Sequence, residues 1–205
     1  WKDTLPARGH VYYGKLLHRT ASLVSLALLP TFYALSPNYG DLDDYLEQYR
    51  EGRMTAEARG VYEALLREGA LATSRLRQVS GLAGGGAVAR AFDRALVDLQ
   101  AEMKIVKVGI SDANRWGYAY VYDLFLRRFP DVPEAARAVS TDAAMDALLL
   151  RYLRNVIAVP EAVARRLFGW DAWEWGRLVE RLAARGHISA GVTIEGVREP
   201  CLVAL

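Results

Sequence analysis

The sequence is poor in the residues that build metal and disulfide sites. It contains one cysteine, Cys201, and three histidines in 205 residues. A single cysteine excludes an internal disulfide framework and any zinc site made from several cysteines, and a reducing cytoplasm is the expected location. His10, His18 and His187 lie too far apart in the sequence for helical metal-ligand spacing. We therefore expect neither a bound metal nor a cofactor.

Long apolar runs and excess charge are also missing. The most apolar segment, residues 22–35 (SLVSLALLPTFYAL), is interrupted by Pro30 and is shorter than the roughly 20 residues that a membrane span requires. It is therefore predicted to be core. The formal net charge is only +2, so any surface for nucleic acid must be local. Four of the 26 cations are lysine and the other 22 are arginine, a bias that suits phosphate recognition but that a GC-rich genome also explains.

Helix-start and helix-stop signals follow one another in a regular order from residue 53 onward. Thr55 is placed to cap a helix that stops near Gly69, Thr73 to cap a shorter helix, and a third helix is expected from about Ala87 to Met103. Alternating β-branched and aromatic residues then predict a hairpin, with strands at 105–110 and 118–124 around a turn at 111–117. A two-stranded ribbon is only marginally stable by itself, so it is expected to pack against the helices. This order predicts a winged helix over residues 53–125.

The same order returns after a connector at 126–139. Thr141 is placed to cap a helix, Pro160 to start the next, and Asp171 and Glu174 have capping-box spacing before a third helix and a closing hairpin. Residues 140–205 are therefore predicted to be a further winged helix, and residues 1–52 to form a hairpin and helices. The predicted fold class is α+β and mainly helical, with tandem winged helix-turn-helix units, each of three helices and a β-hairpin wing.

The third helix of the first complete unit carries the candidate binding residues. At 100° per residue, one arc is apolar and should face the core: Val88, Phe92, Ala95, Leu96, Leu99 and Met103. Arg90 and Arg94 fall on the opposite side, which can lie in a major groove, although a solvated face has the same pattern. Phosphate or wing contacts are predicted for Lys104 and Lys107 and for the residues at the tip of the wing, Asn114, Arg115 and Trp116.

Other candidates have plain structural explanations. The segment GLAGGGA at 81–87 lacks the Gly-Lys-Ser/Thr ending of a phosphate-binding loop and is expected to connect helices. The acidic cluster at Asp41, Asp43, Asp44 and Glu47 suits a cation or acid–base chemistry, but also an ordinary helix start. The aromatic residues Trp116, Tyr118, Tyr120 and Tyr122 suit stacking on a flipped base, but also a strand that lines a core.

Several segments together resemble a known family. These are WKDTLP, YYGKLL, SLALLPTFYAL, YREGRMTAEARGVYEALLREGAL, FDRALVDLQAEMKIVKVGISDANRWGYAYVYDL and LLLRYLRNV. The chain is similar to winged-helix proteins related to the AlkZ and YcaQ DNA glycosylases. The resemblance implies an array of tandem winged helices, typically three, that grips duplex DNA, with residues 1–52 as the remnant of a first unit. The active glycosylases of this family excise alkylated or crosslinked bases, and the resemblance implies this reaction as a possible activity of the chain.

The resemblance does not supply catalytic residues. The active members carry a Gln-x-Gln or Gln-x-Asp motif, whereas Gln48, Gln78 and Gln100 stand in the contexts QYR, QVS and QAE. Three functions therefore stay open: a DNA-binding protein of DNA repair or maintenance with double-stranded DNA as its partner, a DNA glycosylase, and a protein interaction module, since winged helices also pair with proteins.

Overall fold

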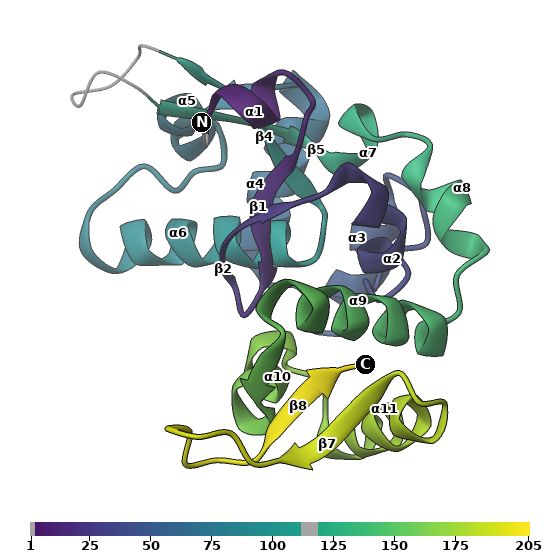
Figure 1. Ribbon diagram of the computed structural model, residues 1–205. Coiled ribbons are helices and arrows are strands. Elements are labelled where there is room, and N and C mark those ends of the chain that lie inside the picture. The colour runs from purple at the N-terminus through teal and green to yellow at the C-terminus, as the bar shows by residue number, and fades with distance from the viewer. Residues whose placement is uncertain (1–2, 112–118) are drawn as a thin grey trace. The chain divides into compact units, whose positions relative to one another are not determined.

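The chain is an α+β protein in which helices are combined with small antiparallel sheets. A computed structural model describes residues 3–111 and 119–205 (Figure 1). The chain divides into two compact units, Trp1–Ala136 (unit 1) and Arg137–Leu205 (unit 2). Within the described ranges, no helix is both long enough and apolar enough to cross a membrane.

Unit 1 begins with a hairpin and short helices. Its first elements are α1 (Thr4–Ala7), β1 (Tyr12–Leu17), β2 (Thr20–Val24), a 3-10 turn at Leu26–Leu28, α2 (Leu29–Tyr33) and α3 (Asp44–Arg50). β1 and β2 pair antiparallel around a turn at His18 and Arg19, whose φ angles of 47° and 54° are left-handed. The hairpin packs against α6 and β4 of the same unit (Figure 1).

The rest of unit 1 combines three helices with a three-stranded sheet. The elements are α4 (Ala56–Glu68), β3 (Leu71–Ala72), α5 (Thr73–Val79), α6 (Gly86–Ala101), β4 (Ile105–Ser111), β5 (Ala119–Leu124), α7 (Phe125–Arg128) and α8 (Val132–Arg137). The sheet is antiparallel with strand order β3-β5-β4. The two-residue strand β3 is too short to leave an alternating pattern in the sequence.

The sheet of unit 1 has apolar packing on both faces. One cluster joins α4 and α6 to the sheet and includes Phe92, Leu99 and Ile105, each fully buried. A second cluster joins the hairpin and α2 to Val106 and Phe125. Neighbouring strand residues point to opposite faces, which explains why Ile105 and Val106 enter different clusters. Residues 3–35 are therefore packed directly onto the sheet that follows α6.

The predicted apolar arc of the third helix is largely buried. Phe92, Ala95, Leu96 and Leu99 face the core from α6, and Met103 is buried just beyond its end. Val88 is the exception, because its side chain is 40% exposed near the start of α6. The prediction that Val88 faces the core was wrong: the first turn of α6 extends beyond the edge of the core.

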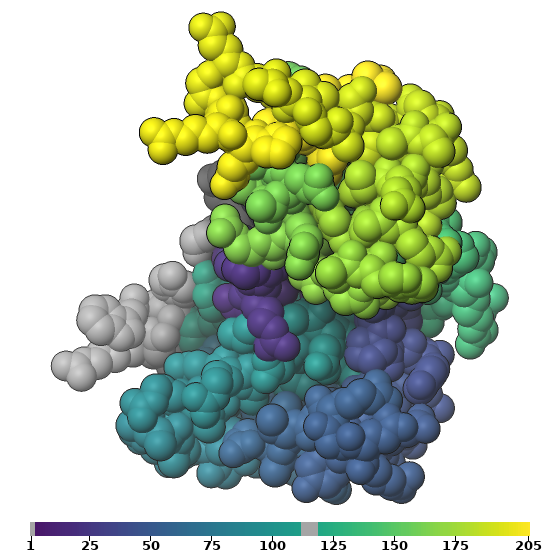
Figure 2. Space-filling view, turned by 90° about the horizontal axis from the view of Figure 1, so that it is seen from below, coloured from purple at the N-terminus to yellow at the C-terminus, as the bar shows by residue number. Residues whose placement is uncertain are grey.

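Unit 2 repeats the element order of the second part of unit 1. Its elements are α9 (Thr141–Val156), β6 (Ala158–Pro160), α10 (Glu161–Phe168), α11 (Ala172–Ala184), β7 (Ile188–Val192) and β8 (Cys201–Ala204). The sheet order β6-β8-β7 matches the order β3-β5-β4 of unit 1, with the last strand in the centre. The connection between β7 and β8, residues 193–200, protrudes from its unit (Figure 2, yellow).

Helix starts follow the capping signals, with shifts of one residue at three helices. Pro160, predicted to start the second helix of unit 2, is instead the last residue of β6 and the N-cap of α10. Thr55 accepts a hydrogen bond from Ala58 N at 3.1 Å, and Asp171 forms the complete capping box of α11. α9 is capped by Ser140, not by Thr141. Thr73 is the first residue of α5 instead of its cap, and its hydroxyl donates to Tyr120 O at 2.8 Å. At α9, the neighbouring residues Ser140 and Thr141 carry equivalent hydroxyl groups. At α5, Tyr120 O competes for the hydroxyl of Thr73.

Candidate functional site

The outer face of α6 carries two exposed arginines. Arg90 and Arg94 are both exposed, one helical turn apart, and lie opposite the buried side of α6 that contains Leu99. Side chains at this spacing are neighbours, with Cβ atoms about 5–6 Å apart. Neither arginine forms an ion pair with any other residue of the described ranges. Two guanidinium groups are thus presented together to solvent.

The acidic residues of α6 are each paired with a cation from another element. Asp93 pairs with Arg77 of α5 at 3.0 Å, and Arg77 also stacks on the ring of Phe92, 4.5 Å from its centre. Asp98 pairs with Arg19 from the turn between β1 and β2. These pairs leave Arg90 and Arg94 as the uncompensated charge of the helix. Sequence reasoning did not identify Arg19 and Arg77, since both pairs join different elements and have no helical spacing to reveal them.

Lys104 lies inside unit 1, not at its surface. Its side chain is 4% exposed, and Nζ lies 3.9 Å from Asp44 Oδ2 and 5.9 Å from the centre of the Tyr62 ring. Burial lowers the pKa of the Lys104 ammonium to about 8, although the carboxylates of Asp44 and Glu102 favour the charged form. Lys104, which was predicted to contact phosphate, is instead buried, because Asp44, sixty residues earlier in the chain, packs beside it.

Asp44 organises the segment before α3. Its Oδ2 atom accepts hydrogen bonds from Tyr39 N at 2.8 Å and Gly40 N at 3.2 Å, in addition to facing Lys104. In the same acidic cluster, Asp41 accepts from Asp43 N at 3.1 Å. Within residues 3–111 and 119–205, no group of three or more His, Cys, Asp or Glu side chains is placed to hold a metal ion. Asp41 and Asp44 thus contact backbone N–H groups, and Asp44 also contacts Lys104.

Lys107 lies between two aromatic rings. Its Nζ atom is 3.6 Å from the centre of the Tyr120 ring and 4.2 Å from that of Tyr13, a cation–π arrangement that joins β4 to β5 and β1. Tyr122, on the same strand as Tyr120, is buried in the core. The remaining wing residues of the prediction, Asn114, Arg115 and Trp116, lie outside the described residues, as does Tyr118.

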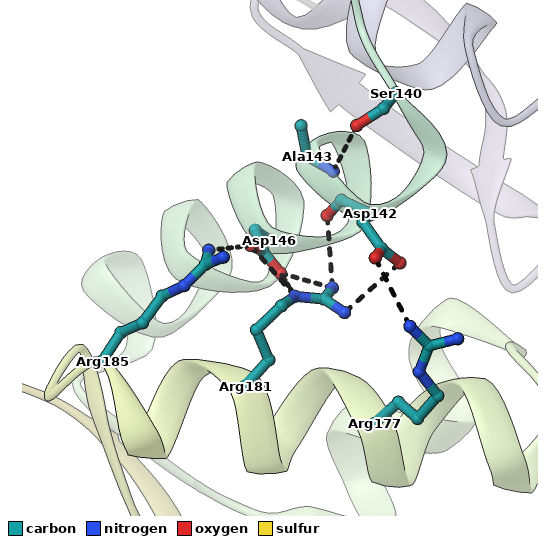
Figure 3. A network of polar contacts seen from close by, with 7 residues as sticks. All are labelled: Ser140, Asp142, Ala143, Asp146, Arg177, Arg181 and Arg185. Atoms are coloured by element: carbon teal, nitrogen blue, oxygen red, sulfur yellow. Dashed lines mark hydrogen bonds and ion pairs between the residues drawn. The ribbon is translucent and has the colours of Figure 1, made fainter.

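Unit 2 presents its arginines differently on the helix that corresponds to α6. Arg181 of α11 binds Asp146 of α9 with Nη2 2.6 Å from Oδ1, and Arg185 binds the other carboxylate oxygen at 3.1 Å (Figure 3). Arg177 and Arg181 also face Asp142, at 3.7 Å and 3.2 Å. Arg177 and Arg181 of α11, and Arg185 directly after its end, are thus held by two carboxylates of α9. This network ties the two helices together, and its two carboxylates offset most of the charge of the three guanidinium groups.

Some aromatic side chains around α11 are packed within unit 2, and one is exposed to solvent. Trp170 stacks on Phe168 with ring centres 4.4 Å apart, and Trp175 is buried and donates its indole N–H to Glu161 Oε1 at 2.8 Å. Trp173 is 68% exposed, with the guanidinium of Arg177 4.8 Å from the centre of its ring.

The fold and the site define an α+β protein with two helix-and-sheet units, one of which carries an exposed pair of arginines on its longest helix. A family described as AlkZ related matches residues 1–169 of the 205. The chain belongs to this family, which confirms the resemblance seen in the sequence. No curated protein and no solved structure matches the chain significantly.

Proposed function

We propose that the chain is a DNA-binding protein of DNA repair, built from tandem winged helices. Membership of the AlkZ-related family supports the repair theme. The order helix, strand, helix, helix, strand, strand occurs in α4-β3-α5-α6-β4-β5 and again in α9-β6-α10-α11-β7-β8. Each set closes its three-stranded sheet in the same way. This is the order of a winged helix, in which the third helix enters the major groove and the hairpin lies beside it.

The exposed pair Arg90 and Arg94 is the observation that carries the proposal. A helix of 16 residues, with a rise of about 1.5 Å per residue, is long enough to cross a major groove. The pairing of Asp93 with Arg77 and of Asp98 with Arg19 places a cation beside each carboxylate of α6 and so weakens its repulsion of a phosphate. Arg90 and Arg94 then contact phosphates or the acceptor edge of guanine. Lys107 supports the sheet beside the helix through its two tyrosine contacts.

The salt dependence of duplex binding tests this proposal. Each phosphate contact contributes a slope of about −0.9 to a plot of log affinity against log salt concentration. Replacing both Arg90 and Arg94 by alanine is expected to reduce the slope by roughly 2 and to weaken binding at low salt. Arg53→Ala is the matched control, because Arg53 is exposed in the same unit but paired with Glu51. Salt-independent binding, or a double variant that binds like the wild-type chain, would refute the assignment.

A second candidate is a DNA glycosylase that excises alkylated or crosslinked bases, which the family favours. The three glutamines of the chain do not form a Gln-x-Gln or Gln-x-Asp motif, and Gln48 and Gln100 are each 1% exposed. We therefore assign no catalytic residue. The direct assay incubates the chain in excess with duplexes that carry alkylated and crosslinked bases. Abasic product would support the glycosylase, and none over the whole panel would remove it for this chain.

A further inference from the structure

The end of α9 holds an isoleucine in an unfavourable backbone conformation. Ile157 has φ 67° and ψ −57°, and its N–H donates to Leu153 O at 2.7 Å. This region of backbone space is rare and strained for a β-branched residue. The side chain is nevertheless 73% exposed, so packing within the described residues does not offset the strain. Strained residues that packing does not explain are concentrated at functional sites.

At the corresponding helix end of unit 1, the residue with a positive φ angle is a glycine. Gly69, with φ 82° and ψ −154°, is the C-cap of α4 and comes two residues before β3, whereas Ile157 is the C-cap of α9 and comes directly before β6. Glycine reaches positive φ angles without a steric penalty. A helix-to-strand turn of this kind therefore has no need of an isoleucine. The exposed apolar side chain at this point of unit 2 requires another explanation.

Exposed arginines surround Ile157 in the sequence of unit 2. Arg151 and Arg154 lie on one face of the last turns of α9, and Arg165 and Arg166 lie on α10 just beyond β6. None of the four forms an ion pair with a residue of the described ranges.

Among the helices of unit 2, α9 and α10 carry the exposed arginines that form no ion pair within the described residues, whereas Arg177 and Arg181 of α11 are paired; Arg198, in the connection between β7 and β8, is also exposed. Glu161, one turn before Arg165 on α10, accepts the indole N–H of Trp175. The arginines of α11 are occupied by Asp142 and Asp146, as Figure 3 shows. A polyanion that approaches unit 2 is therefore attracted to the end of α9 and to α10.

We propose that the end of α9, with Ile157 at its tip, is a second DNA-contact surface. Arg151 and Arg154 bind backbone phosphates, and Ile157 makes an apolar contact with sugars and base edges in the minor groove. Proteins that bind the minor groove combine arginine with exposed apolar side chains, isoleucine among them, in this way. The strain at Ile157 is then retained because the side chain acts in the complex. This inference rests on the proposed function, since it assumes that the chain binds a duplex.

The substitution Ile157→Gly separates a binding role from a structural role. Because glycine relieves the backbone strain, the variant is expected to melt at a higher temperature than the wild-type chain. Its dissociation constant for duplex DNA is nevertheless expected to rise roughly fivefold or more, as one apolar contact is lost. Ile157→Met is the control, because it keeps an exposed apolar side chain and is expected to retain affinity. A stabilised Ile157→Gly variant with unchanged affinity for DNA would overturn the proposal.

The arginines are tested by a second pair of double variants. Replacing Arg151 and Arg154 by alanine is expected to reduce the salt slope of duplex binding by roughly 2. Replacing Arg177 and Arg185, which are exposed but paired with aspartates, is expected to leave the slope unchanged.

The variants of the two units distinguish failure of this inference from failure of the proposed function. If the wild-type chain binds no duplex, both ideas fail. If binding depends on Arg90 and Arg94 but not on Arg151, Arg154 or Ile157, the inference alone is refuted.

Discussion

Lys104 makes the stability of unit 1 depend on pH in an unusual direction. Burial lowers the pKa of its ammonium from the ordinary 10.5 to about 8. In the folded chain Lys104 therefore releases its proton near pH 8, whereas in the unfolded chain it keeps the proton until about pH 10.5. Between these values the unfolded state binds more protons, so the free energy of unfolding rises with pH. Below pH 8 the desolvated charge is a net cost to the fold.

The magnitude follows from the two pKa values. One unit of pKa difference corresponds to about 1.4 kcal/mol, so the full effect is about 3 kcal/mol, of which about 2 kcal/mol is gained between pH 7 and pH 10. At still higher pH the buried tyrosines act in the opposite direction. Burial raises the pKa of Tyr12, Tyr33, Tyr62 and Tyr122, so their ionisation in the unfolded chain lowers stability above about pH 10.

Urea denaturation at pH 7, 8, 9 and 10 measures this effect, with the wild-type chain compared with two variants. Lys104→Met has no charge to titrate, and Lys104→Arg stays charged at every pH tested. The unfolding free energy of the wild type relative to either variant is expected to rise by about 2 kcal/mol between pH 7 and pH 10. A difference that stays flat within about 0.5 kcal/mol would show that the ammonium is not desolvated as the structure indicates.

Two further predictions concern contacts between elements. Arg127 donates to the last carbonyls of α4, Leu65 O and Leu66 O, at 2.7 Å each; Arg127→Ala is expected to lower the unfolding free energy by about 1–3 kcal/mol, and Arg127→Lys not to restore it, because an ammonium lacks the planar fork. Asp171→Ala removes the capping box of α11 and is expected to cost about 1 kcal/mol in thermal or urea unfolding, whereas Asp171→Ser retains most of the stability. Unchanged stability of either alanine variant would contradict the corresponding contact.

The long helices could be predicted because local signals define them. α4 and α11 begin at the predicted caps Thr55 and Asp171, and the apolar arc of α6 is buried from Phe92 onward. In each case a cap and a helical period agree within one segment of the chain. The short strands β3 and β6 were not predicted, since two or three residues carry no detectable alternation.

The electrostatic part of the site could not be predicted from local patterns. The burial of Lys104 depends on Asp44, and the charge of α6 depends on Arg19 and Arg77, all from other elements. The sequence patterns led to no prediction for Arg181 and Arg185, which bind Asp146 of α9. Pairings of this kind arise only once the chain is folded. The spacing of Arg90 and Arg94 on one helix, by contrast, is a local property and correctly indicated an exposed face.

The packing of the β1–β2 hairpin restricts how this chain can be dissected. Tyr12, Val24 and Leu29 cover one side of the sheet around Val106 and Phe125. A fragment that begins at residue 53 would contain every element from α4 to β5. The apolar face of its sheet that the hairpin covers would, however, be exposed to solvent. Such a fragment would be prone to aggregate, so a failure of the fragment to bind DNA would be uninformative. Expression plasmids for the first unit should therefore retain the stretch from Asp3 onward.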